Sequence, residues 1–414
     1  MKKILIVGGG GREHAIATKL KADDVQLFVA PGNAGISQLA TCLPYSATDI
    51  DGIVDWAEHN DLYMVVVTPD DPLAMGMVDE LNKRGIRAFG PKKVAAEIEG
   101  SKAFAKELMH KYNIPTADYR IFTDAQSALQ YVESTNGNLV VKADGLALGK
   151  GVIICNNVNE AKDAIKSIMQ EGAFGKAGNK IVIEEFLQGY EVSVLAFTDG
   201  KTIYPMPPAH DHKRAFDGDQ GLNTGGMGVY SPSPRFDARL MEKAVKEIFV
   251  PTINAMNSEN RKFKGILFFG LMVNGDDIRV LEYNARFGDP ETQAVLPRLK
   301  TPLISIFDAI IDGNLDKIDV EWEQGYTACV ILASGGYPLK YEKGKPIEME
   351  DLNDDTMIFH SGTAYKDGNL VTNGGRVLGV TVTKPTLELA EKEVYSEIKK
   401  ISFDKMFYRT DICK

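Results

Sequence analysis

One stretch of the chain combines residue types that could bind a divalent cation and fix a charged substrate beside it. In Glu282-Tyr283-Asn284 the first and third side chains share one face if the segment is a strand, so both can offer oxygen atoms to one hard cation. Mg²⁺ prefers such ligands and commonly bridges to nucleotide phosphates. Arg286-Phe287-Gly288-Asp289-Pro290-Glu291 follows and adds a guanidinium and two carboxylates. Glu-x-Asn alone is a weak signal, but with these neighbours it predicts a cation site.

A glycine-rich loop with lysines could cover phosphate groups. It runs from Lys142 through Gly145 and Gly149-Lys150 to Gly151, between the predicted strands 139–142 and 152–155. It does not match the Walker A pattern, because Gly151 stands where a Ser or Thr would bind magnesium. We expect its amide groups and Lys142 to neutralise phosphates as the loop closes. A plain hairpin loop is the alternative, against which the glycines and lysines weigh.

A run of glycines near the start favours a second anion site. Gly8-Gly9-Gly10-Gly11 follows the predicted buried strand 4–7 and begins a helix. The run fails the dinucleotide-binding fingerprint, because Glu13 stands in the position of the third glycine, and this argues against NAD. The amides there, with a second turn at Pro31-Gly32-Asn33-Ala34-Gly35, favour a phosphate. A turn needed only for packing is the alternative.

Three further segments carry candidate binding groups. Within 210–214, Asp211 would pair with an amine, and Lys213 and Arg214 would bind phosphate or carboxylate. A histidine metal site is not expected there, since only His360 lies farther along the chain. Gly225-Gly226-Met227-Gly228 would let the backbone approach a ligand, or serve as a flexible tether. Glu184, Glu185 and Glu191 surround another predicted strand, for which a solvated edge strand is the alternative.

The elements that must position these residues fall into three groups. Strands and helices alternate at 4–7, 12–20, 25–30, 50–59, 63–67, 73–84 and 86–89, which predicts a doubly wound parallel sheet. A second group has helices at 102–112, 125–134, 158–170 and 237–256, a hairpin of strands 180–186 and 190–197, an irregular loop at 204–234, and a hairpin of strands 265–273 and 278–283. Strands at 327–333, 356–363, 369–373 and 379–383 and a helix at 387–401 predict a small α+β unit.

Length and composition limit the class of protein. With 414 residues, the chain is long enough for two or three domains. Asp and Glu (57) outnumber Lys and Arg (47), giving a net charge of −10, which argues against a dedicated nucleic-acid binder. The 4 cysteines are scattered without a Cys-x-x-Cys pair, which fits a reducing cytoplasm. No apolar stretch approaches the roughly 18 residues of a membrane span, and 4–7 is too short for a signal-peptide core.

Taken in order, the motifs resemble the phosphoribosylamine-glycine ligase (glycinamide ribonucleotide synthetase) family of the ATP-grasp superfamily. The resemblance covers the whole chain through Gly8–Ala15, Pro31–Gly35, Glu99–Lys102, Asp211–Arg214, Asp217–Asp219, Asn223–Gly228, Leu281–Gln293 and Gly374–Leu378. It implies a multidomain α/β and α+β protein: an N-terminal doubly wound domain on the phosphosugar side (1–100), a two-lobed ATP-grasp centre (101–320) with a mobile lid lobe (about 121–190), and a C-terminal α+β domain (321–414) that closes the site.

The resemblance also implies an activity in de novo purine biosynthesis. Small molecules would be the partners: ATP would join 5-phosphoribosylamine to glycine through glycyl phosphate, with Mg²⁺ or Mn²⁺ as the metal, and the oligomeric state stays open. Catalytic roles fall to Arg286 and Asp289, and metal binding to Glu282 and Asn284. ATP would be bound by Lys102, Lys142, Gly149, Lys150, Gly151, Glu184, Glu185, Leu187 and Glu191. The other substrates would be bound by Gly10, Gly11, Gly32, Asn33, Gly35, Asp211, Lys213, Gly226 and Gly288.

The chain departs from the family pattern at a few positions. Thr68-Pro69-Asp70 stands where relatives carry Gly-Pro-Glu, and His210 where they carry Gln. The strand before Glu282 offers no carboxylate at 268–272 for a second metal. Two alternative functions remain: another ATP-grasp ligase or carboxylase, and a protein that binds a nucleotide without turnover.

Overall fold

The computed structural model describes residues 1–146 and 151–414, and its N-terminal part is the expected parallel sheet. The strand order is β3-β2-β1-β4-β5. Ile4 and Ile6 pack on one face with α1 (Gly11–Lys21) and α12 (Leu303–Asp312), and Leu5 and Val7 pack on the other with α2 (Ile50–His59) and α4 (Met77–Lys83). Helices therefore cover both faces, as an all-parallel sheet requires. Its elements are β1 (Lys2–Gly8), α1 (Gly11–Lys21), β2 (Val25–Pro31), β3 (Thr41–Cys42), α2 (Ile50–His59), β4 (Met64–Val67), α3 (Asp70–Met75), α4 (Met77–Lys83) and β5 (Ala88–Phe89).

The single helix expected at 73–84 is wrong, because the structure has two helices there. Gly76 separates α3 from α4 in a left-handed conformation (φ 99°), which glycine adopts without strain. Two further helices, α5 (Lys93–Gly100) and α6 (Lys102–Lys111), lead out of this domain.

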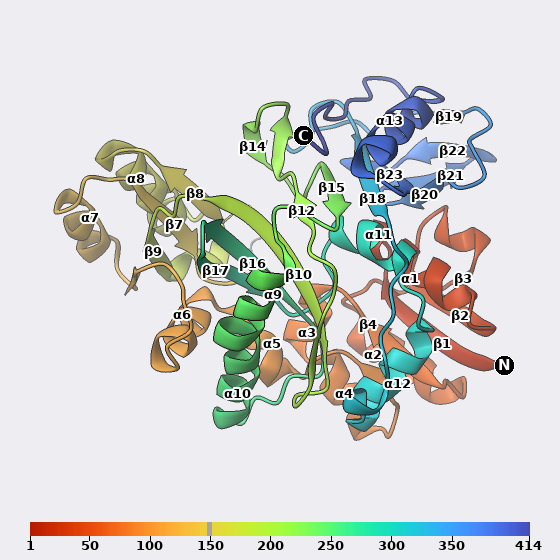
Figure 1. Ribbon diagram of the computed structural model, residues 1–414, viewed down its shortest axis with the longest axis horizontal. Coiled ribbons are helices and arrows are strands. Elements are labelled where there is room, and N and C mark those ends of the chain that lie inside the picture. Colours follow the sequence, from red (N-terminus) through yellow and green to blue (C-terminus); the bar gives the residue numbers. More distant parts are fainter. Residues whose placement is uncertain (147–150) are drawn as a thin grey trace.

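A four-stranded antiparallel sheet in the order β6-β9-β7-β8 forms a separate lobe, which we call the lid. Its elements are β6 (Tyr119–Phe122), α7 (Ala125–Glu133), β7 (Leu139–Ala143), β8 (Val152–Cys155), α8 (Val158–Ile165) and β9 (Ile181–Glu185). Val141 and Ile183 pack against α7 and α8 on one face. Figure 1 shows the lid at one end of the long axis and the N-terminal sheet near the other.

The central sheet has the order β11-β10-β16-β17 and lies between the lid and the N-terminal sheet (Figure 1). Its strands are β10 (Tyr190–Thr198), β11 (Ile203–Pro205), β16 (Gly265–Asn274) and β17 (Asp277–Asn284), with α9 (Ala238–Ala244) and α10 (Val250–Ser258) against one face. The hairpin expected from 180–186 and 190–197 is wrong. β9 pairs with β6 and β7, whereas β10 pairs along its full length with β16, where its apolar residues join the central core.

The C-terminal sheet takes strands from two distant parts of the chain, in the order β12-β15-β18-β23-β20. The segment 204–234, expected to be irregular, supplies β12 (His210–Asp211) and β15 (Gly228–Ser231), and also the hairpin β13 (Arg214–Phe216) and β14 (Gln220–Asn223). The remaining elements are α11 (Glu291–Val295), α12 (Leu303–Asp312), β18 (Tyr326–Ala333), β19 (Glu348–Met349), β20 (Met357–His360), β21 (Thr363–Lys366), β22 (Asn369–Thr372), β23 (Arg376–Lys384), α13 (Leu387–Ile398) and β24 (Ile401–Ser402).

The described helices are all too short or too polar to cross a membrane.

Candidate active site

Two predicted nucleotide-binding residues lie together on the face of the lid sheet opposite α7 and α8. Lys142 and Glu184 come from the paired strands β7 and β9, and both side chains are buried. Lys142 Nζ lies 2.9 Å from Glu184 Oε1 and donates to Leu281 O of β17 at 3.0 Å. Lys106, which no sequence motif indicated, pairs with the other carboxylate oxygen at 3.0 Å. Glu184 is therefore held by a lysine on each side.

The base of the glycine-rich loop is attached to the start of α6. Asp144 accepts hydrogen bonds from Ser101 Oγ and Ala103 N, both at 3.0 Å, and Lys102 Nζ donates to Gly145 O at 2.9 Å. Burial lowers the pKa of Lys102, although Glu282 acts in the opposite direction. Gly151 closes the base by accepting from Ala143 N at 2.8 Å. Gly149 and Lys150 lie outside the described residues.

The residues expected at the adenine and ribose lie along the connection from lid to central sheet. Glu185 Oε1 accepts from Asp118 N at 3.1 Å and pairs with Arg279 at 2.9 Å. Leu187 is half-buried in this connection. Glu191, at the start of β10, pairs with Lys213 at 2.7 Å, so an expected ATP residue and an expected substrate residue are already in contact.

The two predicted metal ligands flank the buried Tyr283 on β17. Glu282 Oε1 lies 3.8 Å from Lys213 Nζ. Burial would raise the pKa of Glu282, but Lys213, Lys142 and Lys102 outweigh it and hold the pKa below its usual range. Asn284 Oδ1 accepts from Arg286 at 3.2 Å. Within residues 1–146 and 151–414 no group of three acidic, histidine or cysteine side chains could enclose a metal, so a hard cation would take its other ligands from phosphates or water.

Arg286 is fixed by a carboxylate from the N-terminal domain. Its guanidinium lies 3.2 Å from Glu99 Oε1, and Glu99 Oε2 accepts from Ala285 N at 2.7 Å. Burial opposes the charge of Arg286, yet Glu99 and Asp70 keep its pKa above the usual value. Glu99 belongs to the Glu99–Lys102 motif of the family resemblance, but the sequence pattern indicated no separate role for it.

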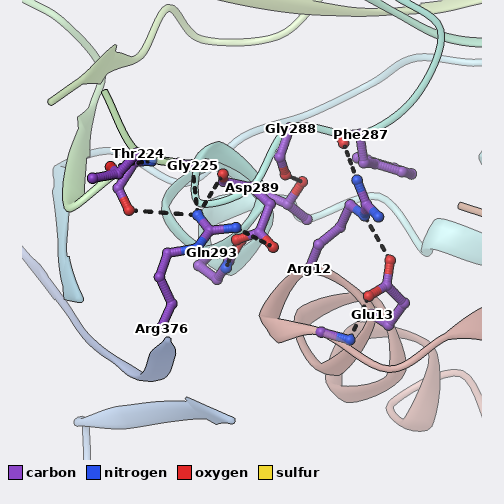
Figure 2. A network of polar contacts seen from close by, with 12 residues as sticks. Arg12, Glu13, Thr224, Gly225, Phe287, Gly288, Asp289, Gln293 and Arg376 are labelled. Atoms are coloured by element: carbon purple, nitrogen blue, oxygen red, sulfur yellow. Dashed lines mark hydrogen bonds and ion pairs between the residues drawn. The ribbon is translucent and has the colours of Figure 1, made fainter. Parts of the chain in front are cut away.

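Asp289 is held by Arg376 at the start of β23, as Figure 2 shows. Arg376 lies 3.2 Å from Asp289 Oδ2 and donates to the backbone oxygens of Asp289 at 2.8 Å and Gly225 at 2.5 Å. Gln293 Nε2 donates to Asp289 Oδ1 at 2.7 Å. Burial would raise the pKa of Asp289, but Arg376 and Arg12 hold it below its usual range. One guanidinium of the C-terminal domain therefore fixes both the aspartate and the glycine-rich segment.

Arg12 and Glu13 join the N-terminal glycine run to the segment that contains Phe287 and Asp289 (Figure 2). Arg12 donates to Phe287 O at 3.0 Å and to Glu13 Oε1 at 2.6 Å, and Glu13 Oε2 accepts from Gly10 N at 2.6 Å. Thr68, one of the departures from the family pattern, donates to Glu13 Oε1 at 2.8 Å. The amide of Gly10 is thus engaged by the protein itself.

Asp211 and Glu291 form an acidic pair, in which Glu291 is buried and Asp211 is half-buried. Glu291 accepts from Ser193 Oγ at 3.0 Å, whereas Asp211 Oδ1 is buried and has no hydrogen-bond partner among the described residues. Burial raises the pKa of each, and the charge of Glu291 raises that of Asp211 further. Gly226 leaves room beside Asp211, since a Cβ there would lie 2.7 Å from Oδ1. The pair can accept a cationic group such as an amine.

The second glycine turn is braced by the C-terminal domain. Asn33 Nδ2 donates to Gly9 O at 2.9 Å and His360 O at 2.7 Å, and its Oδ1 accepts from Ile36 N. Gly35 packs against the rings of His14 and His360. The Asn33 side chain therefore stabilises the turn, and Gly32, with φ +74°, occupies a conformation that favours glycine.

Two polar side chains, Ser361 and Gln293, pack against the start of α1. Ser361 Oγ and Gln293 Oε1 are buried there and have no hydrogen-bond partner among the described residues. Both side chains face Gly11, where a Cβ would lie 2.5 Å from Ser361 Oγ and 2.7 Å from Gln293 Nε2. Gly11 thus lets both side chains approach the backbone closely, and the Ser361 hydroxyl, without a partner among the described residues, can donate to an oxygen atom.

The structure brings most of the predicted site residues into one region. The further residues that contact them, and that no sequence motif had assigned to the site, are mainly charged. Lys106 follows Lys102 by one helical turn, which could have placed the two lysines on one face. Arg376 follows two glycines, a sign of close backbone approach. Ser193 lies within an apolar strand and gave no local signal.

Family models for phosphoribosylglycinamide synthetase match the chain in three consecutive parts. The N domain matches residues 2–99, the ATP-grasp (A) domain residues 100–292 and the C domain residues 327–414. The chain is 48% identical to phosphoribosylamine--glycine ligase of Halalkalibacterium halodurans, over 99% of this chain and 96% of that protein. It is 46% identical to the enzyme of the same name from Listeria monocytogenes, over 99% and 98%.

Solved structures agree with these matches. The crystal structure of phosphoribosylamine--glycine ligase from Thermotoga maritima is 34% identical with a TM-score of 0.88, over 99% of this chain and 100% of that one. A biotin carboxylase from Campylobacter jejuni, 14% identical with a TM-score of 0.77 over 98% and 93%, shares the fold. The expected three-part α/β and α+β fold is thus confirmed. On this evidence the chain belongs to the phosphoribosylglycinamide synthetase family of ATP-dependent ligases.

Proposed function

We propose that this chain joins 5-phosphoribosylamine to glycine with cleavage of ATP to ADP and phosphate, giving glycinamide ribonucleotide. The observation that carries the proposal is the convergence on residues 286–291. Arg12 of the N-terminal domain contacts Phe287 O, Arg376 of the C-terminal domain contacts Asp289, and Ser193 of the central sheet contacts Glu291. A nucleotide-activated acid and a phosphosugar amine, bound on different domains, would meet at this segment.

The first step is transfer of the γ-phosphoryl group to glycine. A carboxylate oxygen of glycine attacks the γ-phosphorus, the bond to the bridging oxygen of ADP breaks, and glycyl phosphate forms. Lys142 and Lys102 would neutralise the nucleotide phosphates, and Arg286, held by Glu99, would stabilise charge on the transferred group. Asp211 would hold the ammonium of glycine, because its buried Oδ1 has no other partner among the described residues.

The second step joins the two substrates. The amine of phosphoribosylamine attacks the carbonyl carbon of glycyl phosphate, the bond from carbon to the phosphate oxygen breaks, and the released phosphate takes up the proton that the amine loses. Asp289 is suited to orient the amine, since Arg376 and Gln293 fix its carboxylate. The sugar phosphate would lie at the N-terminal glycine turns, near Gly11, Gly32 and Gly35, beside Ser361 and Gln293.

A divalent cation fits the remaining oxygen ligands. Glu282 and Asn284 would hold Mg²⁺ or Mn²⁺, and the ionised state of Glu282 suits a hard cation. When bound, the metal would neutralise phosphate charge during transfer. We place the reaction in the cytoplasm, a reducing compartment in keeping with the free state of Cys42, Cys155, Cys329 and Cys413.

Phosphate release with each substrate omitted in turn tests the proposal. Release should require ATP, Mg²⁺, glycine and phosphoribosylamine together, and the ribonucleotide product should form in equal amount. Release that depends on bicarbonate would instead indicate a carboxylase. Tight ATP binding without release under any combination would indicate a protein that binds the nucleotide without turnover.

A further inference from the structure

The Glu184 carboxylate is shared by two buried lysines, although one would neutralise it. Lys106 Nζ lies 3.0 Å from Oε2 and Lys142 Nζ lies 2.9 Å from Oε1. Lys106 and Glu184 are each 2% exposed and the Lys142 side chain 7%. Two ammonium groups and one carboxylate contact one another here, so the contact cluster itself carries a surplus positive charge in a buried place, and Glu282 of β17 is a further carboxylate that acts on Lys142. Such a surplus is costly unless an anion balances it.

The two lysines are held very differently. Lys106 also donates to Thr116 Oγ1 at 2.7 Å and Ala117 O at 3.3 Å, which satisfies all three of its hydrogens. Thr116 in turn donates to Val280 O at 2.7 Å, so Lys106 is fixed to the chain entering the lid and, through it, to β17. Among the residues that the structure describes, Lys142 has Glu184 and one backbone oxygen, Leu281 O.

The cluster lies where the lid joins the rest of the molecule. The chain enters the lid at 114–118 and leaves it after Glu185, and the two connections are paired because Glu185 N donates to Asp118 O at 3.0 Å. Lys106 on α6 reaches both: Thr116 and Ala117 on the entry side and Glu184 on the exit side. Lys142, by contrast, stands at the end of β7 beside the glycine-rich loop.

We propose that Lys106 is a positioning residue for nucleotide binding: by holding Glu184, it leaves Lys142 free to turn from Glu184 to the phosphates. This inference rests on the proposed role of Lys142 in binding ATP. If Lys106 were absent, Glu184 and Lys142 would form a neutral, closed pair, and the phosphates would have to compete with Glu184 for the ammonium. With Lys106 in place, an arriving phosphate balances the surplus charge.

Burial supports this assignment by keeping the surplus charge costly. It lowers the pKa of Lys106 to about 8, against the opposing effect of Glu184, while the charge of Lys142 acts in the same direction as burial. Glu185 also acts on Lys106 and raises its pKa, and the ring of Tyr119 lies 5.7 Å from its ammonium. An anion near Lys142 would relieve the repulsion between the two lysines.

Equilibrium binding of a non-hydrolysable ATP analogue tests the inference. Lys106→Met should weaken binding by on the order of ten-fold and leave glycine binding unchanged. Lys111→Met is the matched control, because Lys111 lies on the same helix and pairs with Glu259 at the surface (63% exposed), and it should bind the analogue as the wild type does. Lys106→Gln, which can still bond to Thr116, is a second neutral variant should the Met variant fold poorly.

The effect of Lys106→Met is then measured in a Glu184→Gln background. If Lys106 acts by holding Glu184, its removal should weaken binding there by less than about three-fold. An equal loss in both backgrounds would overturn the inference, because it would mean that Lys106 acts by general attraction or by stabilising the lid connection.

Lys142→Met separates this inference from the proposed function. If both Lys142→Met and Lys106→Met lose affinity for the ATP analogue, the phosphate-binding role of Lys142 and the positioning role of Lys106 are both supported. Loss in Lys142→Met alone overturns the role of Lys106 and leaves the ligase proposal intact. Wild-type affinity in Lys142→Met overturns the phosphate-binding role of Lys142, and the inference about Lys106 with it.

Discussion

Replacing Arg376 by methionine should damage both stability and activity, because one guanidinium serves several groups. The change removes the ion pair to Asp289 Oδ2 and the hydrogen bonds to the backbone oxygens of Asp289 and Gly225. Asp289 would keep a charged carboxylate with Gln293 as its donor. Removal of one member of a buried ion pair costs about 3–5 kcal/mol. Since the two side chains are 18% and 16% exposed, we expect the lower end, about 3 kcal/mol.

The activity should fall because two site segments lose their shared support. Gly225 would no longer be tied to the segment containing Asp289. A displacement of about 1 Å in such groups can cost on the order of 10²-fold in rate, so kcat/KM in the phosphate-release assay should fall by about that factor. Relative to Arg376→Met, Arg376→Lys should recover part of the stability and little of the activity, since an ammonium cannot donate in the fixed planar geometry of a guanidinium.

Denaturant unfolding and phosphate release, measured on the same preparations, check these numbers. Arg239→Met is the matched control, because its partner Asp276 and Arg239 itself are exposed (71% and 61%) and such pairs contribute about 0–1 kcal/mol. Combining Asp289→Asn with Arg376→Met should restore stability, by removing the unpaired charge, but not turnover. If Arg376→Met matches Arg239→Met in both assays, the support attributed to Arg376 is wrong.

Three further outcomes follow from the site. Glu282→Gln should reduce turnover by at least about 10²-fold. The unfolding midpoint should change little, since the side chain is 35% exposed. Near-normal turnover at limiting Mg²⁺ would contradict the role of Glu282 as a metal ligand. Gly11→Ala should weaken the binding of a stable phosphosugar mimic by about ten-fold, because the new methyl group would lie 2.5 Å from Ser361 Oγ. Calorimetry should show unchanged binding of the ATP analogue. Equal losses of affinity for both ligands would refute separate anion sites. The pKa of Lys106 falls from 10.5 to about 8 on folding, chiefly through burial. Between these two pH values the unfolded chain binds more protons than the folded chain, so the wild type should gain stability relative to Lys106→Met as the pH rises. If the free energies of unfolding of the two proteins, measured with denaturant, change with pH in parallel, this shift is wrong.

Local sequence patterns determined a large part of this protein. The apolar run Ile4–Val7 had to be a buried strand, and it is fully buried in the centre of the parallel sheet. The turn at Asn274–Asp276 joins β16 to β17 as expected. Glu282 and Asn284 lie on one face of β17 because alternate residues of a strand share a face. In each case the pattern acts over a few neighbouring residues, which is the range that sequence spacing describes.

Strand pairing was decided by tertiary structure. The short connection at Gln188-Gly189 suited a hairpin, yet β9 and β10 belong to different sheets. β10 pairs with β16, which is longer than β9 and apolar. The free energy of burial in the central core outweighs the lower loop-closure cost of pairing with the strand next in sequence. For the same reason β12 and β15, from a segment without periodicity, complete the C-terminal sheet.

The charged partners of the site were also beyond the reach of sequence spacing. Arg12 contacts Phe287 O across 275 residues, and Arg376 contacts Asp289 O across 87. The sequence by itself determined which groups could bind phosphate, amine and metal, because residue type sets charge and donor capacity. Only the folded chain decided which carboxylate meets which lysine or arginine, because a contact between distant residues depends on how whole domains pack and on which buried charges must be paired.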